Sequence, residues 1–256
     1  MGTAADSFWR YAGHCLADVL FPRVCGLCGS SGLEPGVDLC AGCRHTIDRA
    51  RAVAFCTRCG TTVGPFGGTK DGCPACRAAH LPTAGFTRVG EFSGGLADLV
   101  RMFKFRGGEH LDRCHGDLLG RAIAQVPWFD EVDVLAAVPT CWQHRLRRRF
   151  HATSALAPHV ARRAGLPLLT LLRRTKGGRH QVGLPKADRI ENVKGKFTIS
   201  RGVALAGAVV CLIDDVATTG ATIGECARVL KRAGARRIYA AVVAHAGGLM
   251  QTPSDV

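Results

Sequence analysis

Two neighbouring carboxylates, Asp214 and Asp215, stand between a short apolar run and a turn of small, hydroxyl-bearing residues. The apolar run, Val209 to Ile213, has the length of a buried strand, and the turn, Thr218 to Thr222, leads into a helical pattern from Ile223. Backbone N–H groups at the start of such a helix can bind phosphate, helped by glycine and threonine. Carboxylates repel phosphate, so the acid pair suits ribose hydroxyls or, through water, a magnesium ion. The stretch predicts a phosphate-binding turn with a sugar- or metal-binding acid pair beside it.

Eight of the thirteen cysteines form four Cys-x-x-Cys pairs, a spacing that is typical of zinc ligands. A disulfide framework is not expected, because the chain shows no pattern of a secretory signal. Two sites of four thiolates account for all eight, and four thiolates leave no open coordination position, so the zinc is expected to be structural. The simplest pairing is sequential, and an interleaved pairing stays open. The two sequential sets are Cys25, Cys28, Cys40 and Cys43, and Cys56, Cys59, Cys73 and Cys76.

Composition favours a folded protein with anionic partners. Apolar residues make up 47% of the chain, which is ample for a core. The formal net charge is +14, which suits nucleic acid, polyphosphate or a phosphorylated ligand. No apolar run is long enough to cross a bilayer, and a cytoplasmic protein is expected.

The elements around these residues are expected to form three parts. Residues 1–24 should hold an amphipathic helix, with apolar positions at helical spacing from Phe8 to Leu20. Residues 25–80 should form a double zinc ribbon, and residues 81–256 an α/β domain. In that domain strand-length apolar runs such as Val132 to Val138 alternate with helical stretches, which predicts a parallel sheet flanked by helices.

Basic residues follow one of the predicted strands. Pro139 and Thr140 come after Val138, and Arg145 opens a cluster of arginines. Open α/β sheets bind ligands at the carboxyl ends of their strands, so these arginines can neutralise an anion there. A solvated basic face is the open alternative. Lys176 lies in a second basic, glycine-containing segment without apolar periodicity, which is typical of a functional lid or of a disordered loop.

The run Ile213 to Thr222 resembles the phosphoribosyl pyrophosphate (PRPP) loop of type I phosphoribosyltransferases. The resemblance implies a type I phosphoribosyltransferase-like parallel sheet flanked by helices. It implies that Asp214 and Asp215 meet the ribose hydroxyls as catalytic residues, with Mg²⁺ bridging diphosphate and ribose oxygens. The turn after Val138 resembles the family's pyrophosphate loop. The residues implied to bind PRPP are Ala217, Thr218, Thr219, Gly220, Ala221, Thr222, Pro139, Thr140, Arg145 and Lys176.

The order of features along nearly the whole chain resembles the ComF family, specifically the ComFC-type proteins linked to natural competence. The shared features are the double zinc ribbon, Lys104-Phe105-Arg106-Gly107, Val138-Pro139, the basic segment Arg174 to Asn192 and the acid-pair loop. The sequence departs from the family at His151-Ala152, where the family usually has Asn-Gln. An amide pair that can donate and accept hydrogen bonds is there replaced by an imidazole and a methyl group.

Two classes of function remain open. The first is an enzyme that transfers phosphoribosyl from PRPP to an acceptor that no motif specifies. The second is a non-catalytic adaptor of DNA uptake, in which the zinc ribbons bind single-stranded DNA or competence helicase partners and the basic surface contacts phosphates.

Overall fold

The computed structural model describes most of the chain. The described residues are 23–64, 67, 72–77, 79–105, 108–139, 151–175 and 193–247. The predicted helix at Phe8 to Leu20 lies outside them, as do three predicted ligand-binding residues, Thr140, Arg145 and Lys176. The part boundaries at residues 24 and 80 stay predictions.

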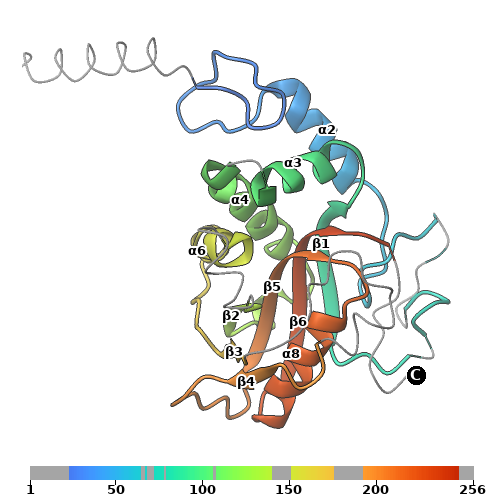
Figure 1. Cartoon of the computed structure of the whole chain (residues 1–256). Helices are drawn as coiled ribbons and strands as arrows, with labels where there is room; N and C mark the ends of the chain where they lie inside the picture. The colour runs from blue at the N-terminus through green and yellow to red at the C-terminus, as the bar shows by residue number, and fades with distance from the viewer. Residues whose placement is uncertain are drawn as a thin grey trace, which may run out of the picture.

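A four-stranded parallel sheet forms the centre of the molecule (Figure 1), in the order β1-β6-β5-β2. Hydrogen-bonded register pairs Ala137 with Ile213 and Ile213 with Ala241. This arrangement confirms the predicted parallel sheet flanked by helices. The strands are β1 (Gly85–Glu91), β2 (Val134–Ala137), β5 (Val209–Ala217) and β6 (Arg237–His245).

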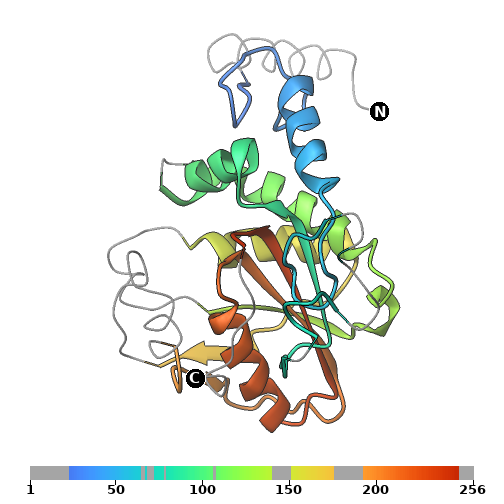
Figure 2. The same cartoon turned by 90° about the vertical axis from the view of Figure 1, so that its right-hand side faces the viewer.

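Helices cover both faces of the sheet because residues of β5 alternate between two cores. Cys211 and Ile213 pack in one core with α3 (Gly94–Phe105), α4 (Asp112–Ile123) and α6 (Ala152–Ala164). Val210 and Leu212 pack in the other core with α8 (Ala221–Arg232). Figure 2 shows these two helical layers on opposite sides of the strands. The helix α8 buries residues at spacings of three and four: Ile223, Cys226, Ala227 and Leu230.

Short elements complete the described chain. An antiparallel pair, β3 (Leu172–Arg174) and β4 (Phe197–Ile199), joins the ends of the basic segment 176–192, which itself lies outside the described residues. Two 3₁₀ turns are η1 (Gly108–Leu111) and η2 (Phe129–Glu131). Among the described residues, no helix has the length and apolar character that crossing a membrane requires.

The cysteine-rich segment folds onto the helices and the sheet. The helix α2 (Ala41–Arg51) of this segment begins directly after Cys40. Asp38 is ion-paired with Arg113 of α4, with 2.8 Å between Oδ1 and Nη2. Further along, the N–H of Phe86 in β1 donates to the carbonyl of Thr57 at 2.6 Å. The first half of the segment therefore contacts the helical layer, and the second half contacts the edge strand of the sheet.

Candidate metal centres and ligand site

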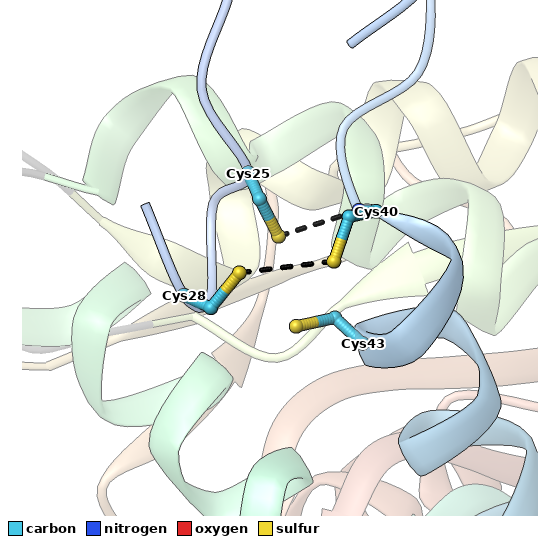
Figure 3. A group of neighbouring side chains, drawn as sticks. All are labelled: Cys25, Cys28, Cys40 and Cys43. Carbon is cyan, nitrogen blue, oxygen red and sulfur yellow. Dashed lines mark hydrogen bonds between the residues drawn. The ribbon is translucent and has the colours of Figure 1, made fainter. Parts of the chain in front are cut away.

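Four cysteines, two from a turn and two from the start of α2, converge in the first cluster (Figure 3). Their sulfur atoms all lie within 4.8 Å of one another. The sulfurs of Cys28 and Cys40 are 3.7 Å apart, and the N–H of Cys40 donates to the sulfur of Cys25 at 3.3 Å. Cys28 is exposed, so this cluster faces solvent on one side.

The second cluster, formed by Cys56, Cys59, Cys73 and Cys76, repeats this arrangement and is buried throughout. The sulfurs of Cys56 and Cys76 are 3.7 Å apart, as are those of Cys59 and Cys73. Both clusters use the sequential sets of cysteines, which was the simpler of the two pairings left open by the sequence.

The spacing of the sulfurs fits tetrahedral zinc. With Zn–S bonds of about 2.3 Å, the edges of a tetrahedron of sulfurs measure roughly 3.8 Å. The observed separations of 3.7 to 3.8 Å match that edge. Two four-cysteine clusters are consistent with two zinc sites, at which four thiolates would leave no open coordination position.

A glycine after the second ligand of the leading pair shapes each cluster. Gly29 and Gly60 have φ angles of 74° and 80°, in the left-handed region that glycine adopts without strain. Each glycine N–H donates back to the carbonyl of the pair's first cysteine, at 2.8 Å to Cys25 and 2.7 Å to Cys56. The Cys-x-x-Cys-Gly pattern thus closes a turn around the ligands.

The acid pair lies inside a strand and not after its end. The strand β5 continues through Asp214 and Asp215 to Ala217, whereas the sequence suggested an end near Ile213. The physical reason is the neighbouring strand, since β6 pairs with β5 along its full length, up to Ala217 opposite His245. Residues near the carboxyl end of β5 thereby gain the rigidity of the sheet.

The two carboxylates have different partners. Oδ1 of Asp214 accepts hydrogen bonds from the Thr153 hydroxyl at 2.9 Å and from the Asp215 N–H at 2.8 Å. Oδ1 of Asp215 accepts from the Val216 N–H at 2.6 Å, and its Oδ2 lies 2.9 Å from the ammonium of Lys104. One acid is therefore held by a neutral hydroxyl and the other by a cation.

This difference sets the electrostatics of the pair. Burial raises the pKa of Asp214 to about 7, and the neighbouring charge of Asp215 adds to the rise. The ammonium of Lys104 and the hydroxyl of Thr153 act in the opposite direction and lower the pKa of Asp214. Burial and the adjacent acid thus both favour the protonated form of Asp214.

Sequence reasoning did not single out Lys104 or Thr153 as site residues. Lys104 lies in the last turn of α3 and Thr153 in the first turn of α6, each far from Asp214 along the chain. The one signal for Lys104 was its place in the Lys-Phe-Arg-Gly stretch of the family resemblance. Thr153 follows His151-Ala152, so the departure from the family pattern lies at the start of the helix that supports the acid pair.

The predicted phosphate turn connects β5 to α8. Gly220 precedes the helix with a φ angle of 70°, in the left-handed region where other residues are strained. Ala221 begins the helix two residues before the predicted start, and its N–H donates to the Thr219 hydroxyl oxygen at 3.3 Å. The positive end of the α8 dipole faces this turn, which is the arrangement that favours an anion.

The remaining predicted residue in the described part, Pro139, lies beside the acid pair. The N–H of Val138 donates to the carbonyl of Ile213 at 2.9 Å, which brings the end of β2 next to Asp214. The structure thus gathers the acid pair, Pro139 and the turn of Thr218 to Thr222 at the carboxyl ends of β2 and β5.

The chain is similar in sequence to several known proteins. A family model described as a double zinc ribbon domain matches residues 16–77. Competence protein F of Haemophilus influenzae is 25% identical over 205 residues, which cover 78% of this chain and 87% of that protein. DNA utilization protein YhgH of Salmonella typhi is 25% identical over 227 residues, 85% of this chain and 94% of that protein. Adenine phosphoribosyltransferase of Mycobacterium tuberculosis is 47% identical over 51 residues, 20% of this chain and 24% of that protein.

Solved structures give weaker matches. The allosteric regulatory enzyme of purine biosynthesis matches with a TM-score of 0.37 and 24% identity, over 53% of this chain and 26% of that one. Adenine phosphoribosyltransferase of Leishmania tarentolae matches with a TM-score of 0.33 and 17% identity, over 55% of this chain and 58% of that one. This chain thus spans about a quarter of the first protein and just over half of the second.

Proposed function

We propose that this chain, a ComF-family protein with an N-terminal double zinc ribbon and a phosphoribosyltransferase-like domain, binds PRPP together with Mg²⁺. The acid pair binds the ribose hydroxyls, and the backbone N–H groups from Thr218 to Thr222 bind the 5′-phosphate. The observation that carries the proposal is the adjacency of two unlike subsites at one sheet edge. The pair of carboxylates, of which Asp215 is buried and Asp214 partly buried, precedes a helix start led by Gly220, five residues after Asp215.

The chemistry of the two subsites matches the two ends of a phosphoribosyl ligand. Carboxylate oxygens accept hydrogen bonds from sugar hydroxyls, and a helix N-terminus attracts phosphate. The acid pair does not suit the phosphate end of the ligand, because carboxylates repel phosphate. The similarity of 51 residues to an adenine phosphoribosyltransferase supports a ligand of this class.

Magnesium, when bound with the ligand, would screen the negative charge of the diphosphate. The residues of this chain contribute the rest. Asp214 and Asp215 are proposed to orient the ribose, and Pro139 to lie beside the leaving diphosphate. Arg145 and Lys176 are proposed to contact that diphosphate. Transfer of the phosphoribosyl group would further require an acceptor, and binding can be tested independently of turnover.

Isothermal titration calorimetry with PRPP and Mg²⁺ tests this proposal. The wild-type protein should give saturable heat, and Asp214→Asn and Asp215→Asn should each weaken binding at least tenfold, about 1.4 kcal/mol or more. Asp130→Asn, an exposed acid in η2, is the matched control and should bind as the wild type does. Absence of saturable heat with the wild-type protein would contradict the proposal.

A second function, in DNA handling, is favoured by the names of the relatives and by the charge of the chain. Relatives over most of the chain are named for competence and DNA utilization, and the net charge is +14. We propose that the zinc ribbons contact single-stranded DNA or helicase-type partners of DNA uptake. DNA affinity should be measurable at low salt and fall steeply as salt rises; affinity that is absent, or insensitive to salt, would exclude phosphate contacts.

We further propose a cytoplasmic location. Eight thiolates remain available for zinc where the compartment keeps cysteines reduced. The two proposed ligands, PRPP and single-stranded DNA, are compatible with one protein because the acid pair and the cysteine clusters are separate groups of residues.

A further inference from the structure

We propose that Lys104 is an exchangeable counter-ion of the acid pair, which keeps free divalent cations off Asp215 until an anionic ligand arrives. The first part of this inference depends only on the geometry of Lys104 and Asp215. The second part, exchange on arrival of the ligand, rests on the proposed phosphoribosyl site.

The geometry places the ammonium at the outward oxygen of Asp215. Oδ1 of this carboxylate is taken by the Val216 N–H at 2.6 Å, whereas Oδ2 lies 2.9 Å from Nζ of Lys104. The Asp215 side chain is 12% exposed, so solvent screens the pair only in part. Oδ2 is thus the oxygen that a metal or a sugar hydroxyl would use, and Lys104 already contacts it.

Electrostatics explain why the lysine excludes a free metal ion. Two adjacent, partly buried carboxylates attract a divalent cation, but an ammonium at the same oxygen repels a double charge twice as strongly as a single one. His115, which packs near this pair against Phe103, does not add a charge at neutral pH, because burial lowers its pKa to about 4. Lys104 is therefore the described cation in contact with the pair.

The position of Lys104 also permits exchange. Its side chain is 24% exposed and lies in the last turn of α3, beside Phe105, which is 57% exposed. Lysine is a flexible side chain with a compact charge and three donors, so it can turn from a carboxylate to a nearby phosphate oxygen. A ligand with several negative charges would give the ammonium a new partner and offset the repulsion of Mg²⁺.

Binding of Mn²⁺ alone, followed by electron paramagnetic resonance at pH 8 on the zinc-loaded protein without PRPP, tests the first part. The wild-type protein should bind Mn²⁺ weakly, and Lys104→Met should gain a site with at least tenfold higher affinity. Lys104→Arg should behave as the wild type does. Adding Asp215→Asn to Lys104→Met should abolish the gain, which assigns the new site to the acid pair.

Arg101→Met is the matched control, since Arg101 lies one turn earlier on α3 and is paired with Asp98 at the surface, 2.8 Å away. It should leave Mn²⁺ binding unchanged. Equal Mn²⁺ affinity in the wild type and Lys104→Met would overturn the inference. So would tight Mn²⁺ binding by the wild type that Asp215→Asn removes, a result that needs no lysine variant to fold.

Calorimetry with PRPP and Mg²⁺ tests the second part. Lys104→Met should bind at least tenfold more weakly than the wild type, and Lys104→Arg should restore most of the affinity. If the wild type binds no PRPP while Lys104→Met still gains Mn²⁺, the proposed function fails and the exclusion of metal stands. If PRPP binds equally to the wild type and Lys104→Met, the exchange fails and the proposed function stands.

Discussion

At the scale of single residues, Asp214 and Asp215 show how neighbours of one type acquire different properties. Asp215 has a lysine ammonium at 2.9 Å, whereas Asp214 has the hydroxyl of Thr153 at 2.9 Å. A cation favours the charged form of a carboxylate far more than a hydroxyl does, whereas burial disfavours that charged form. The pKa of Asp214 is accordingly raised to about 7.

The raised pKa of Asp214 predicts that stability falls as the pH rises. An unfolded aspartate has a pKa near 4, so between about pH 4 and 7 the folded state binds more protons than the unfolded state. Stability from this group is therefore full below about pH 4 and is lost as the pH rises through 7. Asp214→Asn should remove this loss, which we expect to be on the order of 2 kcal/mol.

Chemical denaturation at pH 5 and pH 8 measures the effect. The difference in unfolding free energy between the two pH values should be smaller in Asp214→Asn than in the wild type. Asp98→Asn, an exposed acid on α3, should retain the wild-type difference. Parallel pH profiles for the wild type and Asp214→Asn would show that Asp214 titrates normally.

Some site residues could be predicted from sequence and others could not, for a physical reason. The cysteines carry their chemistry in local spacing, so both clusters follow from the sequence. Lys104 and Thr153 meet Asp215 and Asp214 only because α3 and α6 pack on the same face of the sheet. No local pattern records such a contact.

At the scale of elements, α4 and α6 approach closely because two glycines on α4 lack side chains. A Cβ on Gly116 would lie 2.3 Å from the Cβ of His159 and 2.8 Å from the carbonyl of Leu156. Gly120, one turn later, meets Arg163 in the same way, at 2.6 Å from its Cβ. The close contact fixes α6, whose first turn supplies Thr153 to the acid pair.

Gly116→Ala should therefore destabilise the protein by about 1–3 kcal/mol, because α6 must move to admit the methyl group. Gly224→Ala in α8 is the matched control, since its Cβ would come no nearer than 3.5 Å to a neighbour, at Pro82. That change should be neutral or stabilise by up to about 1 kcal/mol through helix propensity. Thermal unfolding of both variants checks the prediction, and equal stability would argue against tight α4–α6 packing.

Element types were more predictable than element ends. The apolar run of β5 indicated a buried strand, but its last residues, from Asp214 to Ala217, are polar and small. They are extended because β6 continues beside them. The start of α8 at Ala221 follows from the left-handed backbone of Gly220, a conformation that the residue type permits but does not require.

At the scale of the whole molecule, the two cysteine clusters are coupled to different parts of the fold. Gly60 of the second cluster lies against β1 and β6, where an added Cβ would be 2.4 Å from the Phe86 ring and 3.1 Å from His245. His245 pairs in register with Ala217, the last residue of β5 before the phosphate turn. The first cluster instead contacts η1, directly before α4, where Gly26 meets Leu111, and it exposes Cys28.

This asymmetry predicts that zinc leaves the two clusters at different rates. A chelator should remove one zinc from the folded protein through the exposed first cluster, and the second zinc only as the sheet unfolds. A colorimetric chelator assay, run beside far-UV circular dichroism, measures both processes. Cys28→Ser should keep the sheet and lose the fast phase, whereas Cys59→Ser should lower global stability. Release of both zinc ions in one phase before any unfolding would contradict the assignment.

The most direct test of the account is a crystal structure of the zinc-loaded protein with PRPP and Mg²⁺. We predict the 5′-phosphate within hydrogen-bond distance of the backbone N–H groups from Thr218 to Thr222, and the ribose hydroxyls on Asp214 and Asp215. A ligand bound away from this sheet edge, with the acid pair still closed by Lys104, would contradict the account.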